Sequence, residues 1–165
     1  MGILSNGYIS AAAQQLQVST NSASGYVITA TSSGRFINPA TGFFLPDANG
    51  GNGLTNNDTP APGVINAGTP AFGIHACGAR SGALSGNSGI SAGDIWINAG
   101  TLSNSARFSN PWNTGSNAYY ATIASYTGGP VTTDNTAILY GATISGTTPA
   151  GLYSTTLTYV ATATF

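Results

Sequence analysis

The sequence predicts an all-β fold, an immunoglobulin-like or jelly-roll β-sandwich with an extended N-terminal arm. Glycine supplies 23 of the 165 residues, about twice the usual share, and lies with Asn, Ser and Thr between short segments, as turn residues do. Within those segments apolar and polar residues alternate with a period of two, which is typical of half-buried strands. No stretch of useful length has helical periodicity. Several short strands bounded by turns indicate a sandwich or a barrel.

The first segment, residues 3–18, is expected to be extended. Its centre, residues 11–17, contains good helix formers, but it is too short for an isolated helix and its flanks favour a strand. A strand would place its apolar residues on both faces, which predicts a bulge near residues 14–15. The two sets are Ile9, Ala11 and Ala13 on one face, and Leu16 and Val18 on the other. We therefore predict an arm over residues 1–19 and a single sandwich domain over residues 20–165.

Further strands are predicted where apolar runs lie between Gly, Pro or Asn residues. They cover residues 26–31, 43–45, 72–76, 94–97 and 119–126. Residues 46–68 are rich in Asn, Gly and Pro and are predicted to form a surface loop.

The C-terminal segment has the clearest alternation. From residue 153 to residue 165 the odd positions are mostly apolar and the even positions mostly carry hydroxyl groups. An alternating stretch precedes it, and the loop between them contains Gly and Pro, so we expect a two-stranded antiparallel hairpin over residues 137–165. Phe165 keeps the parity of the apolar face, so the strand is expected to stay in the sheet up to this residue.

Charged side chains are rare: the chain has three Arg and four Asp, and neither Lys nor Glu. A net charge of −1 without basic clusters excludes partners such as nucleic acid or an anionic lipid surface. No apolar run of about 18 residues occurs, so no membrane span is predicted. Because a low net charge promotes association, the predicted partner is a second copy of the chain.

No arrangement of side chains predicts catalysis, so we expect no enzyme and no cofactor. His75 and Cys77 would point to the same side of a strand, but zinc needs three or four ligands and the chain has no other His or Cys. Packing is the favoured interpretation of both. Residues 47–58 resemble a calcium loop that lacks its closing bidentate acid, which leaves a structural calcium ion open. Most Asp residues lie in turn-like contexts, where they usually cap turns.

Aromatic residues indicate a second kind of function. Trp112 and Tyr120, with Trp96, Tyr119 and neighbouring Asn residues, are of the type that stacks on sugars. Packing of Trp96 in the core and of Trp112 over a sheet edge is the favoured interpretation, so glycan stacking by Trp112 and Tyr120 remains an alternative.

Two segments resemble those of known proteins. Residues 144–165 contain Thr-Pro-Ala-Gly-Leu-Tyr followed by a Thr-rich alternating strand, and residues 16–30 contain Thr-Asn-Ser-Ala-Ser-Gly-Tyr. Both are similar to secreted bacterial surface proteins, including Patescibacteria-type ones and the spore-coat-U-like pilins of archaic chaperone-usher systems. The paired cysteines common in those pilins are missing. The resemblance implies an extracellular β-sandwich of the pilus or surface-fibre kind.

Together these features predict a secreted structural subunit of a pilus-like filament on the cell surface. The arm would complete a neighbour's sandwich by donor-strand addition and so join copies into a homopolymer, although it could instead pair within its own domain. The predicted interface residues are Ile3, Leu4, Ile9, Ala11, Ala13, Leu16 and Val18. Two alternatives stay open, a glycan-binding adhesin module and a viral capsid or fibre protein of the jelly-roll type.

Overall fold

The computed structural model describes residues 1–48, 65–77 and 121–165, and these residues form antiparallel sheets and no helix. One three-stranded sheet has the order β1-β7-β5, formed by β1 at Ile9–Thr20, β7 at Val131–Thr143 and β5 at Ala71–Cys77. The other has the order β6-β2-β8, formed by β6 at Ala121–Tyr126, β2 at Tyr26–Ser32 and β8 at Leu157–Ala163. A short hairpin joins β3 at Phe36–Ile37 to β4 at Phe44–Leu45. The all-β prediction is confirmed, and the arrangement is consistent with a β-sandwich.

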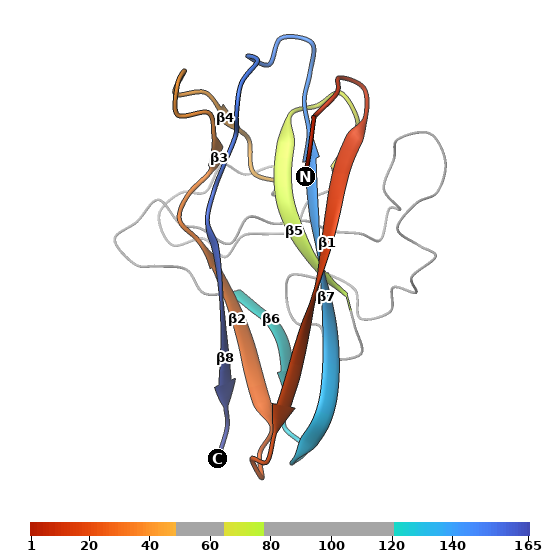
Figure 1. Cartoon of the computed structure of the whole chain (residues 1–165), viewed down its shortest axis with the longest axis vertical. Coiled ribbons are helices and arrows are strands. Elements are labelled where there is room, and N and C mark those ends of the chain that lie inside the picture. The colour runs from red at the N-terminus through yellow and green to blue at the C-terminus, as the bar shows by residue number, and fades with distance from the viewer. Residues whose placement is uncertain (49–64, 78–120) are drawn as a thin grey trace.

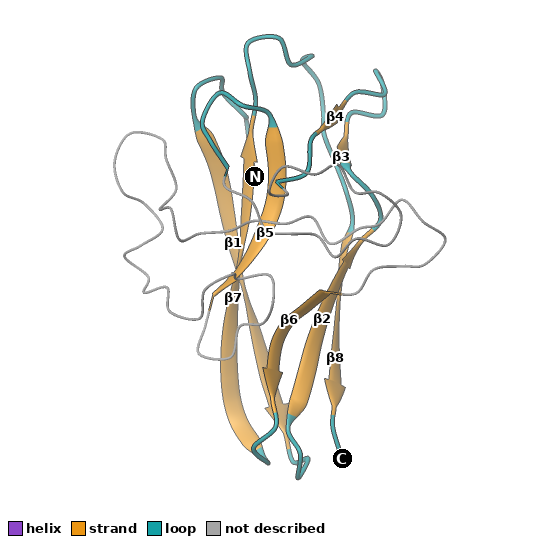
Figure 2. Ribbon diagram, turned by 180° about the vertical axis from the view of Figure 1, so that it is seen from behind, coloured by secondary structure: helices purple, strands orange, loops and turns teal. Residues whose placement is uncertain are grey.

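The two three-stranded sheets face each other and share one core (Figures 1 and 2). Because side chains alternate along a strand, every second residue of β2, β5 and β7 points inward. The buried members are Tyr26, Ile28 and Ala30 of β2, Phe72, Ile74 and Ala76 of β5, and Ile138 and Ala142 of β7. The hydrophobic side chains of the inner faces therefore hold the sheets together.

Most strands form where local alternation predicts them. The strands expected at 26–31, 43–45 and 72–76 are confirmed as β2, β4 and β5, and part of 119–126 is confirmed as β6. Residues 11–17 are confirmed as strand, within β1. The strand expected at 94–97 and most of the loop expected at 46–68 lie outside the described residues.

The hairpin predicted over residues 137–165 is wrong. Its two strands, β7 and β8, belong to different sheets, and β8 pairs with β2. The connection over residues 144–156 is longer than the 2–5 residues typical of a hairpin loop, so it can cross from one sheet to the other. Crossing places Tyr159 of β8 against Tyr140 of β7, and Leu157 and Tyr159 then pack partly against the core from the opposite sheet.

The bulge predicted near residues 14–15 is also wrong. The pairing of β1 with β7 runs without a shift from Ile9 opposite Thr143 to Val18 opposite Asp134, and the register changes only between Val18 and Thr20. Alanine is small enough to sit on the outer face of a strand at little cost, so the apolar residues on the two faces need no bulge to realign them.

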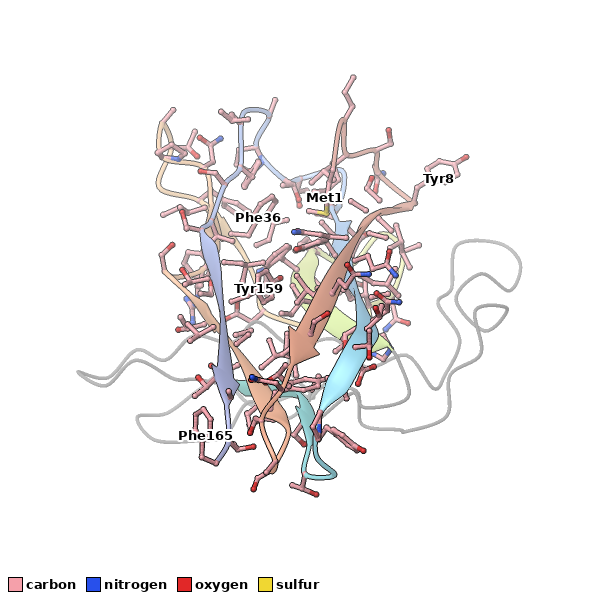
Figure 3. All side chains as sticks on the ribbon, turned by 60° about the horizontal axis from the view of Figure 1, so that its bottom comes forward. Met1, Tyr8, Phe36, Tyr159 and Phe165 are labelled. Carbon is pink, nitrogen blue, oxygen red and sulfur yellow. The ribbon has the colours of Figure 1, made fainter. Side chains whose placement is uncertain are left out.

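The prediction that the last strand stays in the sheet up to Phe165 is wrong. The last paired residue of β8 is Ala163, and Phe165 is 97% exposed beyond the end of the strand (Figure 3). The backbone just before it is nevertheless held, because the Thr164 amide donates to the Gly25 carbonyl at 3.0 Å. The chain is tied to the start of β2 at Thr164, and the ring of Phe165 has no core to enter.

Candidate functional site

The outer edge of β1 is the first candidate site. Within the described residues β1 has one partner strand, β7 of the same chain, so pairing inside its own domain is what the structure shows for residues 9–20. Leu16 and Val18 pack against the core, whereas Ile9 and Ala11 are half-buried and Ala13 is exposed on the opposite face. The predicted interface residues of β1 therefore divide between two faces and cannot all fill one groove.

The residues before β1 lie at the end of the sandwich where β7 stops. Leu4 packs partly against the core, and Ile3 is 92% exposed. With Met1 they line one side of a cavity of about 630 Å³, whose other walls are Phe36 and the connection over residues 144–153. Ile3 and Leu4 are thus not paired with any strand of the described structure, in contrast to the residues of β1.

A chain of side-chain hydrogen bonds joins β1, β7 and β8 across the two sheets. The Tyr140 hydroxyl donates to Gln14 Oε1 at 2.9 Å, and the Tyr159 hydroxyl lies 2.9 Å from that of Tyr140. Because the single Tyr140 proton is directed to Gln14, Tyr159 is the donor in the second bond. Figure 3 shows Tyr159 pointing from β8 into the space between the sheets. Burial, and then the contact with Tyr140, raise the pKa of Tyr159 well above its ordinary value.

The described charged residues make contacts within the chain. Tyr26 donates its hydroxyl proton to Asp134 Oδ2 at 2.8 Å, which links β2 to β7. Arg35 Nε lies 3.6 Å from Asp47 Oδ2, and the Arg35 guanidinium carbon is 4.2 Å from the centre of the Phe44 ring. Within residues 1–48, 65–77 and 121–165 there is no group of three or more His, Cys, Asp or Glu that could hold a metal ion.

Arg35 and Phe44 belong to a second candidate site, an open depression of about 480 Å³ beside the β3–β4 hairpin. Its lining consists of Ser33, Gly34, Arg35, Ile37, Phe44, Ser154, Thr155 and Thr156. Figure 1 shows how β3 and β4 lie beside the segment that leads into β8. Residues far apart in the sequence therefore form one surface.

No protein-family model, curated protein or solved structure matches the chain.

Several predicted residues lie elsewhere. Trp112 and Tyr120 are outside the described residues, as are Trp96, Tyr119 and most of the possible calcium loop. His75 is fully buried in β5 opposite Leu139, on the face of the sheet away from the main core. No helix in the described part of the chain is long and apolar enough to cross a bilayer.

The sequence did not single out Arg35, Phe44, Tyr140 or Tyr159 as functional. Arg35 carried one usable signal, since it is one of only three cations in the chain. The two tyrosines carried none, because an alternating strand gives a core tyrosine and a bridging tyrosine the same pattern.

Proposed function

We propose that this chain is a structural subunit of an extracellular, pilus-like filament in which neighbouring copies exchange β1. One observation carries the proposal: among the described strands β1 lies at the edge of its sheet, and its link to the rest of the sandwich is the short connection over residues 21–25. Such a strand can leave its sheet without threading through the fold. A copy of β1 from a neighbour can then take the vacated place beside β7.

The exchange re-forms the contacts that it breaks. A neighbour's β1 finds the same β7, with Leu16 and Val18 against the same core and the same backbone register from Ile9 to Val18. Exchange of an identical element is for this reason a low-cost route to association. When each copy donates β1 to the next, the contact is heterologous, and it grows an open chain rather than a closed dimer.

The charge distribution supports burial of this surface between copies. Burying an unpaired charge is costly, and interface cores are depleted of charged residues. β1 carries none, and the one charged residue of its partner β7, Asp134, accepts a hydrogen bond from Tyr26. The extracellular location in the proposal rests on the resemblance of residues 16–30 and 144–165 to secreted surface proteins.

Strand order favours a jelly-roll over an immunoglobulin-like sandwich within this proposal. Among the described strands of the two larger sheets, consecutive strands alternate between sheets: β1, β5 and β7 in one, β2, β6 and β8 in the other. In immunoglobulin-like domains the last two strands pair in one sheet. Jelly rolls also build viral capsids, so a capsid or fibre protein is the second candidate function.

The test locks β1 into its own sheet. Gln17 and Asn135 are exposed, oppose each other in the β1–β7 register and share a side-chain hydrogen bond. In a Cys77→Ser background, the double variant Gln17→Cys/Asn135→Cys is expected to form an internal disulfide across the two strands. Under oxidising conditions this protein should stay monomeric in sedimentation and show no filaments by electron microscopy, and reduction should restore assembly.

The matched controls are the two single-cysteine variants in the same background, which should assemble with or without reductant. Mixed before assembly, they should also give a disulfide-linked dimer that joins residue 17 of one copy to residue 135 of another. Normal filaments from the oxidised double variant would rule out strand exchange. Closed shells from the reduced protein would favour the capsid candidate instead.

A further inference from the structure

The outer edge of β8 is open along the whole strand. β8 pairs with β2 on one side, and within the described residues no strand pairs with it on the other (Figure 2). Val160, at its centre, is 43% exposed, and residues 161–163 are exposed as well. Proteins usually protect such an edge with charged side chains, a proline or a bulge. β8 has none of these, since its sequence is Leu-Thr-Tyr-Val-Ala-Thr-Ala and its register with β2 runs without a shift.

The backbone groups that face this open edge belong to odd-numbered residues. On the other side of β8, the Ser33 amide donates to the Thr156 carbonyl at 2.9 Å, and the Thr164 amide donates to the Gly25 carbonyl at 3.0 Å. Along an antiparallel pair, residues that bond to the partner strand alternate with residues that do not. The even-numbered residues of β8 therefore bond to β2. The amides and carbonyls that point outward are those of Leu157, Tyr159, Ala161 and Ala163.

The sequence of β8 is complementary to itself in the antiparallel direction. When a two-fold axis relates two copies at Val160, the strands overlap along all of β8 and their outward backbone groups meet. The opposing residues are then Leu157 and Ala163, Thr158 and Thr162, Tyr159 and Ala161, and Val160 and its own counterpart. Each large side chain lies opposite a small one, and each threonine lies opposite a threonine. A shift by two residues shortens the overlap and places Tyr159 or Ala161 opposite itself.

The burial of β8 fits the same arrangement. Leu157 and Tyr159 are half-buried, whereas Ala161 and Ala163, on the same face of the strand, are exposed. In the two-fold pair, the exposed alanines of one copy lie beside the two larger side chains of the other. Neither β8 nor its neighbour β2 carries a charged residue, so the contact removes no charge on these strands from water.

We propose that β8 pairs with β8 of a second copy, antiparallel and about a two-fold axis at Val160, so that one sheet continues through both copies. The contact is isologous and therefore joins two copies only. A single pair of strands is marginally stable in water, so separate copies should pair weakly and sediment as monomers unless they are concentrated. The pairing uses neither β1 nor its exchange, and so it does not depend on the proposed filament.

Cysteine cross-linking tests the pairing and its register together. In a Cys77→Ser background, Thr158→Cys, Val160→Cys and Thr162→Cys each place one thiol at an exposed position of β8. Only residue 160 meets itself, whereas the two copies of residue 158 lie about 13 Å apart, farther than the ~7 Å between Cα atoms that a disulfide can bridge. Under mild oxidation, Val160→Cys should therefore form a covalent dimer at least about ten-fold faster than either threonine variant alone.

A mixture of the two threonine variants is the matched control for register. Residues 158 and 162 oppose each other, so an equimolar mixture of Thr158→Cys and Thr162→Cys should cross-link at least about ten-fold faster than either variant alone. Val160→Lys in both partners places like charges opposite each other and should abolish this cross-linking. Gln15→Lys adds the same charge at an exposed position of β1 and should leave the rate unchanged. Circular dichroism should show that all variants are folded.

Equal rates for the three single-cysteine variants would mean collision without register and would overturn the proposal. An absence of faster cross-linking in the mixture, or unchanged cross-linking after Val160→Lys, would also overturn it. The cross-link between residues 17 and 135 that tests strand exchange lies on other strands. Failure of one test therefore leaves the other result intact.

Discussion

Alanine substitution at two glycines distinguishes backbone strain from steric overlap, and the comparison tests how closely β2 and β6 approach each other. Gly25 and Gly42 have nearly the same left-handed conformation, with φ of +77° and +72°. Among the described residues no heavy atom lies within 4 Å of a Cβ placed at Gly42, whereas a Cβ at Gly25 would lie 2.0 Å from the Tyr126 carbonyl oxygen. That oxygen is backbone and cannot rotate away. Gly25→Ala must therefore push β6 from β2, and Gly42→Ala need not move anything.

The expected loss of stability has two contributions, the strain of the left-handed backbone and the steric overlap of the added Cβ. The left-handed conformation costs an L-residue about 1–2 kcal/mol, so Gly42→Ala should lower the free energy of unfolding by that amount. Gly25→Ala has the same term and an overpacking term of about 1–3 kcal/mol in addition. Urea unfolding of both variants at a concentration where sedimentation shows monomers gives the difference directly, provided that the m-values agree. Equal destabilisation by the two substitutions would refute the close approach.

Three further outcomes are expected. Tyr140→Phe removes two hydrogen bonds and should lower the free energy of unfolding by about 1–3 kcal/mol, whereas Tyr159→Phe removes one and should lower it by about 0.5–1.5 kcal/mol. The double variant should lose less than the sum, because the two substitutions remove the same Tyr140–Tyr159 bond; a double-mutant cycle in urea measures the difference. Because the pKa of Tyr159 is raised in the folded state, its contribution to the free energy of unfolding is complete below pH ~10 and is lost as the pH rises above that value. The loss is at most about 1.4 kcal/mol per pH unit, and solvent access to the ring reduces it. The midpoint of unfolding should therefore fall less with rising pH in Tyr159→Phe than in the wild type. Phe72→Ala should cost about 3–5 kcal/mol because this ring is buried and stacks on Phe36 at 4.5 Å, whereas Phe165→Ala, at an exposed ring, should leave the melting temperature unchanged.

Strand positions could be predicted from the sequence because alternation is a local property. Burial alternates along β2 in the expected order, and both β2 and β5 form where the sequence predicts strands, although residues 71–76 of β5 are buried on both faces. Strand partners are not local. β7 and β8 both read as amphipathic strands whether they pair in one sheet or face each other across the core, so the hairpin over 137–165 and the crossing pair have the same pattern.

The candidate sites were harder to predict for the same reason. Arg35, Phe44 and Thr155 form one depression only because the Ile37–Ser154 bridge brings the hairpin to the segment before β8. The edge position of β1 likewise depends on which strands flank β7. Ile9 and Leu16 lie on opposite faces of β1, as alternation predicts, but no bulge brings them together, because the alanines that share the face of Ile9 are small enough for the outer side of the sheet.

The rarity of charge has a structural counterpart that bears on the proposed assembly. The three charged side chains that the structure describes, Arg35, Asp47 and Asp134, each contact a partner inside the chain. A charge held in this way orders its neighbours and leaves the surrounding surface to hydroxyl and amide groups, which lose less free energy than charges when another molecule covers them. The lack of free charge on β1 and β7 is therefore compatible with the proposed burial of this pair between copies. Assembly driven by backbone pairing and apolar contact should then be insensitive to ionic strength, unlike association through surface charges.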